Sequence, residues 1–165
     1  MMLTHINELL LKLSKRPGID EYFLMEALVV SSRGTCSRRK VGCVLVDKYD
    51  RILSTGHNGV PKGLQHCIDH PCPGSSMSTG QGLSDCEAIH AEQNAIGSCQ
   101  ARSSVRKAYC TTSPCVNCIK LLLTTPCEEI VFLDEYPHSQ SKELWQRSKR
   151  KWRKYEKQDN IIQES

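Results

Sequence analysis

KAYCTTSPCVNCIKLLLTTPCEEIVFL, residues 107–133, contains a helix pattern between two strand patterns. Lys107 to Thr111 and Glu129 to Leu133 are short, mostly apolar runs that predict strands, and Cys115 to Leu123 predicts the helix between them. A strand, a helix and a second strand in this order indicate an α/β fold.

The chain on the N-terminal side of this stretch adds a hairpin and a helix. Val41 to Val46 is a short apolar run containing β-branched residues, and Arg51 to Gly56 follows it after a polar turn, so the pair predicts a hairpin. Asp85 to Ser98 predicts a helix, with Ser84 or Asp85 as its N-cap. These elements all precede the strand–helix–strand stretch.

Three further helices are expected outside this central part. Leu3 to Leu13 has apolar residues at helical spacing, Tyr22 to Ser32 predicts a second helix, and Ser141 to Tyr155 predicts a final amphipathic helix. From Val41 onward the order is strand, strand, loop, helix, strand, helix, strand, helix. This order predicts an α/β fold in which a mixed central sheet forms the middle of a three-layer α/β/α sandwich.

Length and composition indicate one globular domain, residues 1–165. Hydrophobic residues make up 39% of the chain and charged residues 24%, as in ordinary globular proteins. No apolar run approaches the ~20 residues that a bilayer requires. The first residues lack the basic start and the cleavage site of a signal peptide. We therefore expect a cytoplasmic protein that has no membrane partner.

The cysteine content and the charge distribution both stand out. Ten cysteines in a cytoplasmic chain indicate metal ligation or catalysis rather than disulfides. The net charge is +4, and much of the excess lies at 149–154, within a predicted basic C-terminal helix or tail at 141–165. We interpret this tail as a solvated helix end, although such a run can also bind nucleic acid or anionic nucleotides.

Two short motifs carry the chemistry: His90-Ala91-Glu92 and Pro114-Cys115-Val116-Asn117-Cys118. Both lie near predicted helix beginnings, where the positive helix end helps to keep thiols deprotonated. Cys115 and Cys118 are three residues apart and share a helix face, and His90 supplies a third ligand. Two thiolates and an imidazole suit zinc, and three protein ligands leave the fourth tetrahedral position open for water.

Glu92 distinguishes an enzyme from a structural zinc site. It lies two residues after His90, so it points elsewhere on the helix and need not bind the metal. Zinc lowers the pKa of water toward neutrality, the hydroxide can attack a carbon that bears an amine, and Glu92 can pass the proton to the ring nitrogen and the leaving ammonia. H-x-E followed by P-C-x-x-C is the signature of zinc-dependent nucleobase deaminases.

With these motifs the chain resembles the deoxycytidylate (dCMP) deaminases of bacteria and phages, from about Arg33 to Tyr136. The resemblance rests on Gly56-His57-Asn58-Gly59, His90-Ala91-Glu92-Gln93-Asn94-Ala95 and Ser113-Pro114-Cys115-Val116-Asn117-Cys118. It implies a cytidine-deaminase-like fold and hydrolysis of dCMP to dUMP and ammonia, which supplies dUMP for thymidylate synthesis. Members of this family are commonly hexamers, so the resemblance also implies a homo-oligomer.

The resemblance assigns roles to individual residues around the zinc ligands and Glu92. Asn58 is expected to hydrogen-bond the sugar and the base, because its amide both donates and accepts. The backbone at Ala91 is expected to recognise the base, Ser113 belongs to the same substrate-binding set, and Tyr136 matches a tyrosine near the phosphate. No arginine that binds the phosphate can be named from the sequence.

The long irregular stretch from His57 to Asp85 resembles the region that holds a second, structural zinc in phage and bacterial members. A loop of this length inside a compact domain is usually functional or needs a cross-link, such as a bound metal ion, to hold it in place. Its expected ligands are Cys36, Cys67, Cys72 and Cys86, which would give two zinc ions per chain. His66 or His70 could replace one of these cysteines. The remaining thiols outside both sites, at Cys43, Cys99, Cys110 and Cys127, are interpreted as core residues.

The stretch from Gly56 to Gly63 resembles the loop that regulated members place near an effector site. Amides at Gly59 and Gly63 could approach a phosphate closely, and Lys62 adds a positive charge. The resemblance implies activation by dCTP, with magnesium accompanying it, and inhibition by dTTP. The alternative is a glycine-rich turn that serves only the fold.

Other functions remain open at this point. Transfer-RNA adenosine deaminases share both motifs, and the basic tail would fit RNA. Free cytidine deaminases are similar, but usually have a cysteine in place of His90. A non-catalytic zinc module that binds a partner would have no use for Glu92. Nucleic acid is not the expected partner, because the chain has only two Trp and two Phe for base stacking.

Overall fold

The computed structural model describes residues 16–77, 85–137 and 139–156. The strands are β1 (Gly42–Val46), β2 (Ile52–His57), β3 (Lys107–Thr112), β4 (Glu129–Asp134) and β5 (Lys151–Lys154). The helices are α2 (Ile19–Ser31), α3 (Ala91–Ser98), α4 (Val116–Leu122) and α5 (Ser139–Arg147), with short 3₁₀ turns η1 (Pro73–Ser76) and η2 (Arg102–Ser104).

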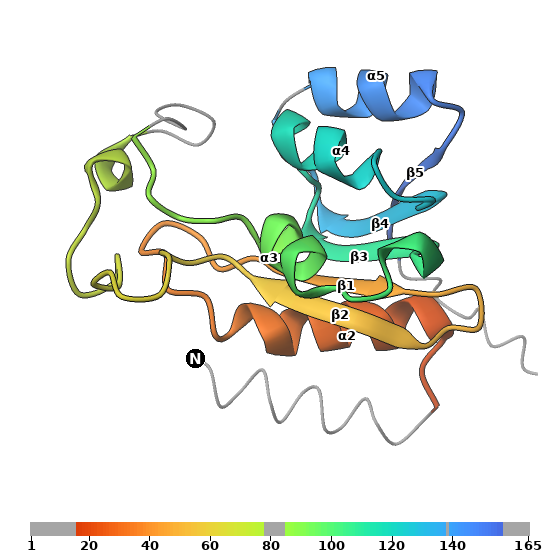
Figure 1. Cartoon of the computed structure of the whole chain (residues 1–165), viewed down its shortest axis with the longest axis horizontal. Helices are drawn as coiled ribbons and strands as arrows, with labels where there is room; N and C mark the ends of the chain where they lie inside the picture. Colours follow the sequence, from red (N-terminus) through yellow and green to blue (C-terminus); the bar gives the residue numbers. More distant parts are fainter. Residues whose placement is uncertain (1–15, 78–84, 138, 157–165) are drawn as a thin grey trace, which may run out of the picture.

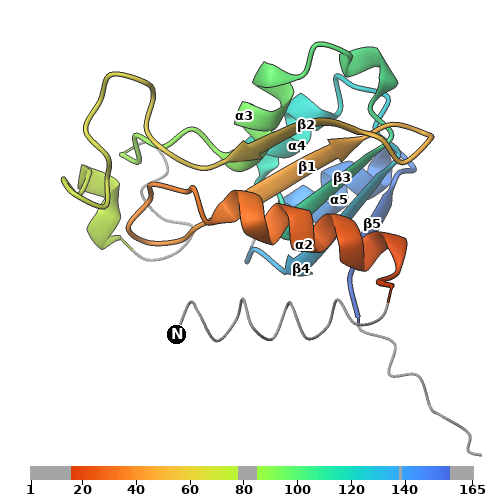
Figure 2. The same ribbon diagram turned by 90° about the horizontal axis from the view of Figure 1, so that it is seen from below.

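The strands form one mixed sheet in the order β2-β1-β3-β4-β5. β1 pairs with β2 and β3 in antiparallel fashion, whereas β3, β4 and β5 run parallel to one another. Helix α2 covers one face of the sheet, and α3, α4 and α5 lie on the other (Figure 1 and Figure 2). The prediction of a three-layer α/β/α sandwich with a mixed sheet is confirmed.

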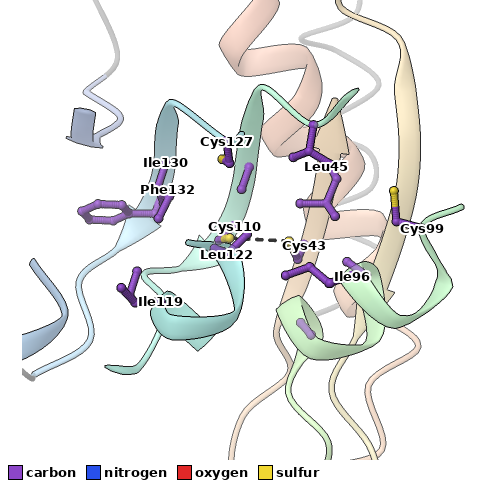
Figure 3. Packing of buried hydrophobic residues seen from close by; sticks show 14 of the residues in the cluster. Cys43, Leu45, Ile96, Cys99, Cys110, Ile119, Leu122, Cys127, Ile130 and Phe132 are labelled. Carbon is purple, nitrogen blue, oxygen red and sulfur yellow. Dashed lines mark hydrogen bonds between the residues drawn. The ribbon is translucent and has the colours of Figure 1, made fainter. Parts of the chain in front are cut away.

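Each face of the sheet has its own apolar cluster, because successive side chains of a strand point to opposite faces. Val44 packs with Phe23 of α2 on one face, and Leu45 packs with Ile96 and Ile119 on the other. The larger cluster, on the α3 and α4 side, is drawn in Figure 3. The thiols predicted to be core residues are all buried in it: Cys43, Cys99, Cys110 and Cys127.

A close approach between β2 and α3 fixes the helix that carries His90 and Glu92. A Cβ atom added to Gly56 would collide with the backbone of Ala91 and Ala95, so only glycine allows this spacing. Ser54 on the same strand donates a hydrogen bond from Oγ to the carbonyl of Ala95, at 2.7 Å. The start of α3 is thereby held against the end of β2.

The helix predicted for Asp85 to Ser98 is shorter than expected. It begins at Ala91 with His90 as its N-cap, so the N-cap prediction was wrong. The preceding segment is extended because Gly59 and Ile89 exchange two backbone hydrogen bonds, at 3.1 and 2.9 Å. This tertiary pairing outweighs the local helix preference and places His90 at the first turn.

The C-terminal segment also differs from the single helix predicted for 141–155. Helix α5 ends at Arg147, Lys149 adopts the left-handed conformation with φ of 61°, and β5 follows. The buried Trp145 closes this turn, since its indole N–H donates to the carbonyl of Lys151 at 2.8 Å. The prediction was wrong because pairing with the edge of β4 makes a fifth strand.

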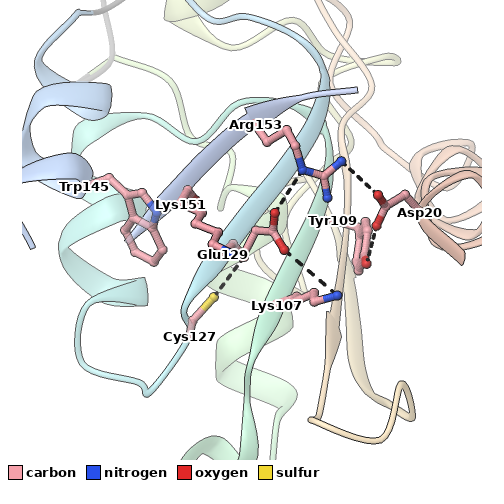
Figure 4. Close-up of polar contacts among 8 residues, drawn as sticks. All are labelled: Asp20, Lys107, Tyr109, Cys127, Glu129, Trp145, Lys151 and Arg153. Carbon is pink, nitrogen blue, oxygen red and sulfur yellow. Dashed lines mark hydrogen bonds and ion pairs between the residues drawn. The ribbon is translucent and has the colours of Figure 1, made fainter. Parts of the chain in front are cut away.

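Some basic residues of this segment make contacts within the fold. Arg153 contacts Asp20 of α2 at 2.8 Å and Glu129 of β4 at 2.9 Å, and Tyr109 donates to the same aspartate (Figure 4). Arg150 donates to the carbonyl of Thr125 at 3.0 Å. The interpretation of the whole run as a solvated helix end therefore has to be corrected, since part of it is a structural strand.

Within the ranges described, no helix is long and apolar enough to cross a bilayer. The predicted helix Leu3–Leu13, the alternative N-cap Ser84 and the end of the basic tail lie outside the described residues. The assignment of 1–165 to a single domain stays a prediction.

Candidate metal centre and active site

Two helix beginnings bring three metal-type ligands together. His90 is the N-cap of α3 and Cys115 the N-cap of α4, and Cys118 lies in the first turn of α4. His90 Nδ1 lies 3.4 Å from the Sγ of Cys115 and 3.4 Å from the Sγ of Cys118. The predicted grouping of these three residues is thus observed, with both thiols buried.

The spacing of these atoms fits a zinc ion. With Zn–S near 2.3 Å and Zn–N near 2.0–2.1 Å, a tetrahedral ion holds its sulfur and nitrogen ligands about 3.6 Å apart. The observed separations of 3.4 Å are close to this value. Within the part of the chain that the structure describes, this is the one group of three whose ligand atoms all lie within 4.8 Å of one another.

The electrostatics of the cluster favour a thiolate at Cys115. The neighbouring Cys118 thiol, together with His90, lowers the pKa of the Cys115 thiol to about 4. The same contact with Cys115 raises the pKa of Cys118 and of His90. A metal cation would replace the shared protons, because zinc binds the deprotonated thiol.

Glu92 lies beside this cluster and is only 3% exposed. Its Oε2 accepts a hydrogen bond from the Sγ of Cys118 at 3.4 Å. Burial raises the pKa of the Glu92 carboxyl above its ordinary value. A buried carboxylate next to an open metal position can take up and return a proton, so the site has the parts of an acid–base catalyst.

A pocket of about 160 Å³ opens onto Glu92 and two of the metal ligands, His90 and Cys115. All the residues predicted to bind substrate line it, together with two arginines that were not predicted. The lining includes Asn58, Ala91, Ser113, Tyr136, Arg38 and Arg39. The structure therefore brings the predicted site residues to one place, although their roles toward a substrate stay predictions.

Asn58 and Ser113 both hold backbone at the pocket wall. Asn58 Oδ1 accepts a hydrogen bond from the Val41 amide at 2.8 Å, and its Nδ2 donates to the carbonyl of Arg39 at 2.7 Å. Ser113 Oγ accepts from the amide of Tyr136 at 2.7 Å. Each side chain thus positions a neighbouring pocket residue.

Arg38 and Arg39 were missed by sequence reasoning. Both line the pocket beside Asn58, and they stand just before Val41 at the start of the first hairpin. The signal available was the basic triplet Arg38-Arg39-Lys40, a charge run next to a predicted strand.

A comparison with protein-family models matches residues 17–134 to the cytidine and deoxycytidylate deaminase zinc-binding region. The chain belongs to the cytidine and deoxycytidylate deaminase family. The match covers the metal ligands, Glu92 and most of the pocket.

Individual members of this family agree with the match. The deoxycytidylate deaminase of Mycobacterium phage D29 is 37% identical over an alignment of 128 residues that covers 73% of this chain and 98% of the phage protein. The deoxycytidylate deaminase of Saccharomyces cerevisiae is 35% identical over 73% of this chain. The chain spans only 39% of the length of that yeast protein.

A solved structure of a family member has the same fold. The dCMP deaminase from the cyanophage S-TIM5, in complex with dCMP and dUMP, superimposes with a TM-score of 0.68 at 27% identity. The match covers 86% of this chain and 99% of the cyanophage chain. The family member therefore shares the sandwich over nearly its whole length.

Of the four cysteines predicted as a second zinc site, Cys67 and Cys72 lie in the long loop after β2. Cys86 lies between this loop and α3, and Cys36 lies before β1. The Sγ atoms of Cys67 and Cys72 are 3.7 Å apart. Cys36 and Cys86 line the pocket, and burial, together with the neighbouring thiols of Cys72 and Cys36, raises the pKa of Cys86. The four thiols are less closely grouped than the three ligands at His90.

The predicted effector residues occupy the turn after β2. Gly59 is fixed by its pairing with Ile89, and a Cβ there would meet the side chain of Thr35. Gly63 has φ of 97°, which only glycine adopts readily, and Lys62 beside it is exposed. The alternative of a turn that serves the fold is supported at Gly59, while effector binding stays a prediction.

Proposed function

We propose that the protein hydrolyses dCMP to dUMP and ammonia. The observation that carries this proposal is the pocket in which a zinc-type ligand set and the buried Glu92 face the same space. The D29 relative, which the chain covers almost completely, is a deoxycytidylate deaminase, and the cyanophage relative was solved with dCMP and dUMP. Such an activity would supply dUMP for thymidylate synthesis. The free cysteines of the protein suit the cytoplasm, where thiols are kept reduced.

The chemistry divides between the metal and Glu92. A zinc ion held by His90, Cys115 and Cys118 supplies Lewis acidity that makes water nucleophilic near neutral pH. Glu92 takes the proton that the attacking water loses and delivers it to the ring nitrogen. The same carboxylate then takes the second proton from the hydroxyl group now on the ring carbon and delivers it to the departing amine, so one water is consumed and one ammonia is released. Burial keeps this carboxyl poised to hold a proton.

The pocket wall suits the rest of a nucleotide. The amide of Ala91 is among the first N–H groups of α3, which have no acceptor within the helix, so it can donate to the base. Arg38 and Arg39 bring positive charge to the pocket, which Tyr136 also lines. Guanidinium groups pair well with phosphate, which favours a nucleotide over a nucleoside.

A substrate panel tests this proposal against its alternatives. dCMP, CMP, deoxycytidine and a transfer-RNA anticodon stem would each be incubated with the purified protein, and loss of the amine followed by absorbance. We expect dCMP to react fastest. Preferential reaction of adenosine in the anticodon stem would indicate a transfer-RNA deaminase, and inactivity on every substrate would indicate a zinc module.

We also propose a second, structural zinc bound by Cys36, Cys67, Cys72 and Cys86. The Cys67–Cys72 separation of 3.7 Å supports it, as do hydrogen bonds that, against the effect of burial, hold the pKa of Cys67 at about 7. Cys67→Ser should release about one of two zinc ions and lower the melting temperature, because structural zinc contributes to folding. Elemental analysis that finds one zinc per folded wild-type chain would exclude the site.

We propose that nucleotides regulate the activity by binding at the turn after β2. Gly59 is hydrogen-bonded to Ile89, the residue before His90, so a nucleotide bound near Lys62 could shift the start of α3. In a homo-hexamer we expect dCTP with magnesium to lower the apparent KM for dCMP, dTTP to raise it, and kinetics to be sigmoidal. A coupling of about 5- to 150-fold in affinity is typical. Hyperbolic kinetics for dCMP that neither dCTP nor dTTP changes would exclude this proposal.

A further inference from the structure

Arg38 lines the active-site pocket, and it is also held by a contact outside the pocket. Its Nη1 donates a hydrogen bond to the carbonyl of Gly74 at 2.9 Å. A guanidinium group is planar and rigid, so one such bond restricts the plane of the whole group. Where Arg38 points in the pocket therefore depends on where Gly74 lies.

Gly74 is itself tightly placed. Its amide donates to the carbonyl of Asp85 at 3.0 Å, and the residue is buried. A Cβ atom added to Gly74 would lie 2.9 Å from the amide nitrogen of Cys86 and 3.0 Å from its Cα. These atoms are backbone, so an added methyl group would push the backbones of Gly74 and Cys86 apart and disturb the Gly74 carbonyl.

The loop also contacts the residue before Arg38. Ser37 Oγ lies 3.3 Å from the Sγ of Cys67, and Cys67 in turn lies 3.7 Å from Cys72. Gly74 follows Cys72 by two residues. The segment 67–74 therefore contacts both Ser37 and Arg38, whereas the metal ligands and Glu92 are carried by α3 and α4.

We propose that the segment 67–74 is a positioning element for Arg38, which sets the affinity for the substrate's phosphate without setting the rate of the chemical step. Gly74 acts through its carbonyl, and Cys67 acts through Ser37. The inference rests on the proposed function, because it requires a substrate with a phosphate. It predicts that disturbing this segment raises KM for dCMP and leaves both kcat and the reaction of deoxycytidine unchanged.

The test is a double-mutant cycle on steady-state kinetics. Arg38→Ala should raise KM for dCMP by about 10- to 100-fold, the range of a hydrogen bond to a charged group. Gly74→Ala should raise KM for dCMP several-fold, with kcat on dCMP and kcat/KM for deoxycytidine unchanged. The double variant should match Arg38→Ala within about twofold, because both substitutions remove the same contact.

Gly97→Ala is the matched control, since a Cβ there meets no atom within 4 Å, and its KM for dCMP should be that of the wild type. If Gly74→Ala does not fold, Ser37→Ala replaces it in the cycle with the same expected pattern. Additive effects of the two substitutions on KM, or equal losses for dCMP and deoxycytidine, would overturn the inference. A wild-type protein inactive on dCMP would instead refute the proposed function.

Discussion

Glu92→Gln should lower kcat for dCMP by at least about 10²–10⁴-fold, the range of general acid–base catalysis. Glu92 is 3% exposed and contacts Cys118, so its carboxyl faces the metal centre and not the solvent. Glutamine has the same shape but cannot take up or return a proton. The variant should therefore fold, keep its zinc and bind dCMP, which calorimetry and elemental analysis can measure.

Glu87→Gln is the matched control for this change. Glu87 is exposed, lies five residues earlier and does not line the pocket, so the same change of charge should leave kcat as in the wild type. Near-normal turnover of the Glu92→Gln variant would contradict the assigned role, because no proton transfer would then depend on this carboxyl.

Cys115→Ser and His90→Ala should each remove one zinc per chain and abolish measurable turnover. Their ligand atoms lie 3.4 Å apart, and loss of either leaves only two protein ligands for the ion. Zinc content is read by elemental analysis and turnover by the absorbance of the cytosine base.

Cys99→Ser is the control for loss of a buried thiol, since Cys99 ends α3 and lies outside both cysteine sites. This variant should keep its zinc and its activity. A Cys115→Ser protein that retains full zinc and full turnover would show that the catalytic ion is bound elsewhere.

The central strands and the catalytic set were predictable because their signals are local. The apolar runs before and after Cys115 match β3 and β4 within one residue, and Cys115 and Cys118 are close in sequence. His90 joins them through the fold, and the motif around it was enough to anticipate this.

The two wrong boundaries have a common physical cause. Ile89 is extended because it pairs with Gly59, 30 residues earlier, and β5 forms because β4 offers it an unpaired edge. No glycine or proline marks the break at Lys149, and the alternation over Lys151–Lys154 is too short to predict a strand. The pairing that sets these two boundaries leaves no periodic signal in the residues before His90 or in Lys151–Lys154.

The pocket residues also divide into those that a local sequence signal indicates and those that only the fold brings to the pocket. Asn58 and Ser113 lie in family motifs and Tyr136 was found through the wider resemblance to the family, whereas Arg38 and Arg39 lie in no motif and enter the pocket through tertiary contacts. Arg38 donates a hydrogen bond to the backbone carbonyl of Gly74, and a contact of this kind depends on the fold and leaves no mark in the sequence.

Reaction of the wild-type zinc protein with dCMP in ¹⁸O-labelled water tests the central claim most directly. Mass spectrometry should find dUMP that carries one ¹⁸O in its base, with one ammonia released for each dUMP formed. Unchanged dCMP after prolonged incubation with the zinc-loaded protein, or dUMP that contains no label, would contradict hydrolytic deamination at this site.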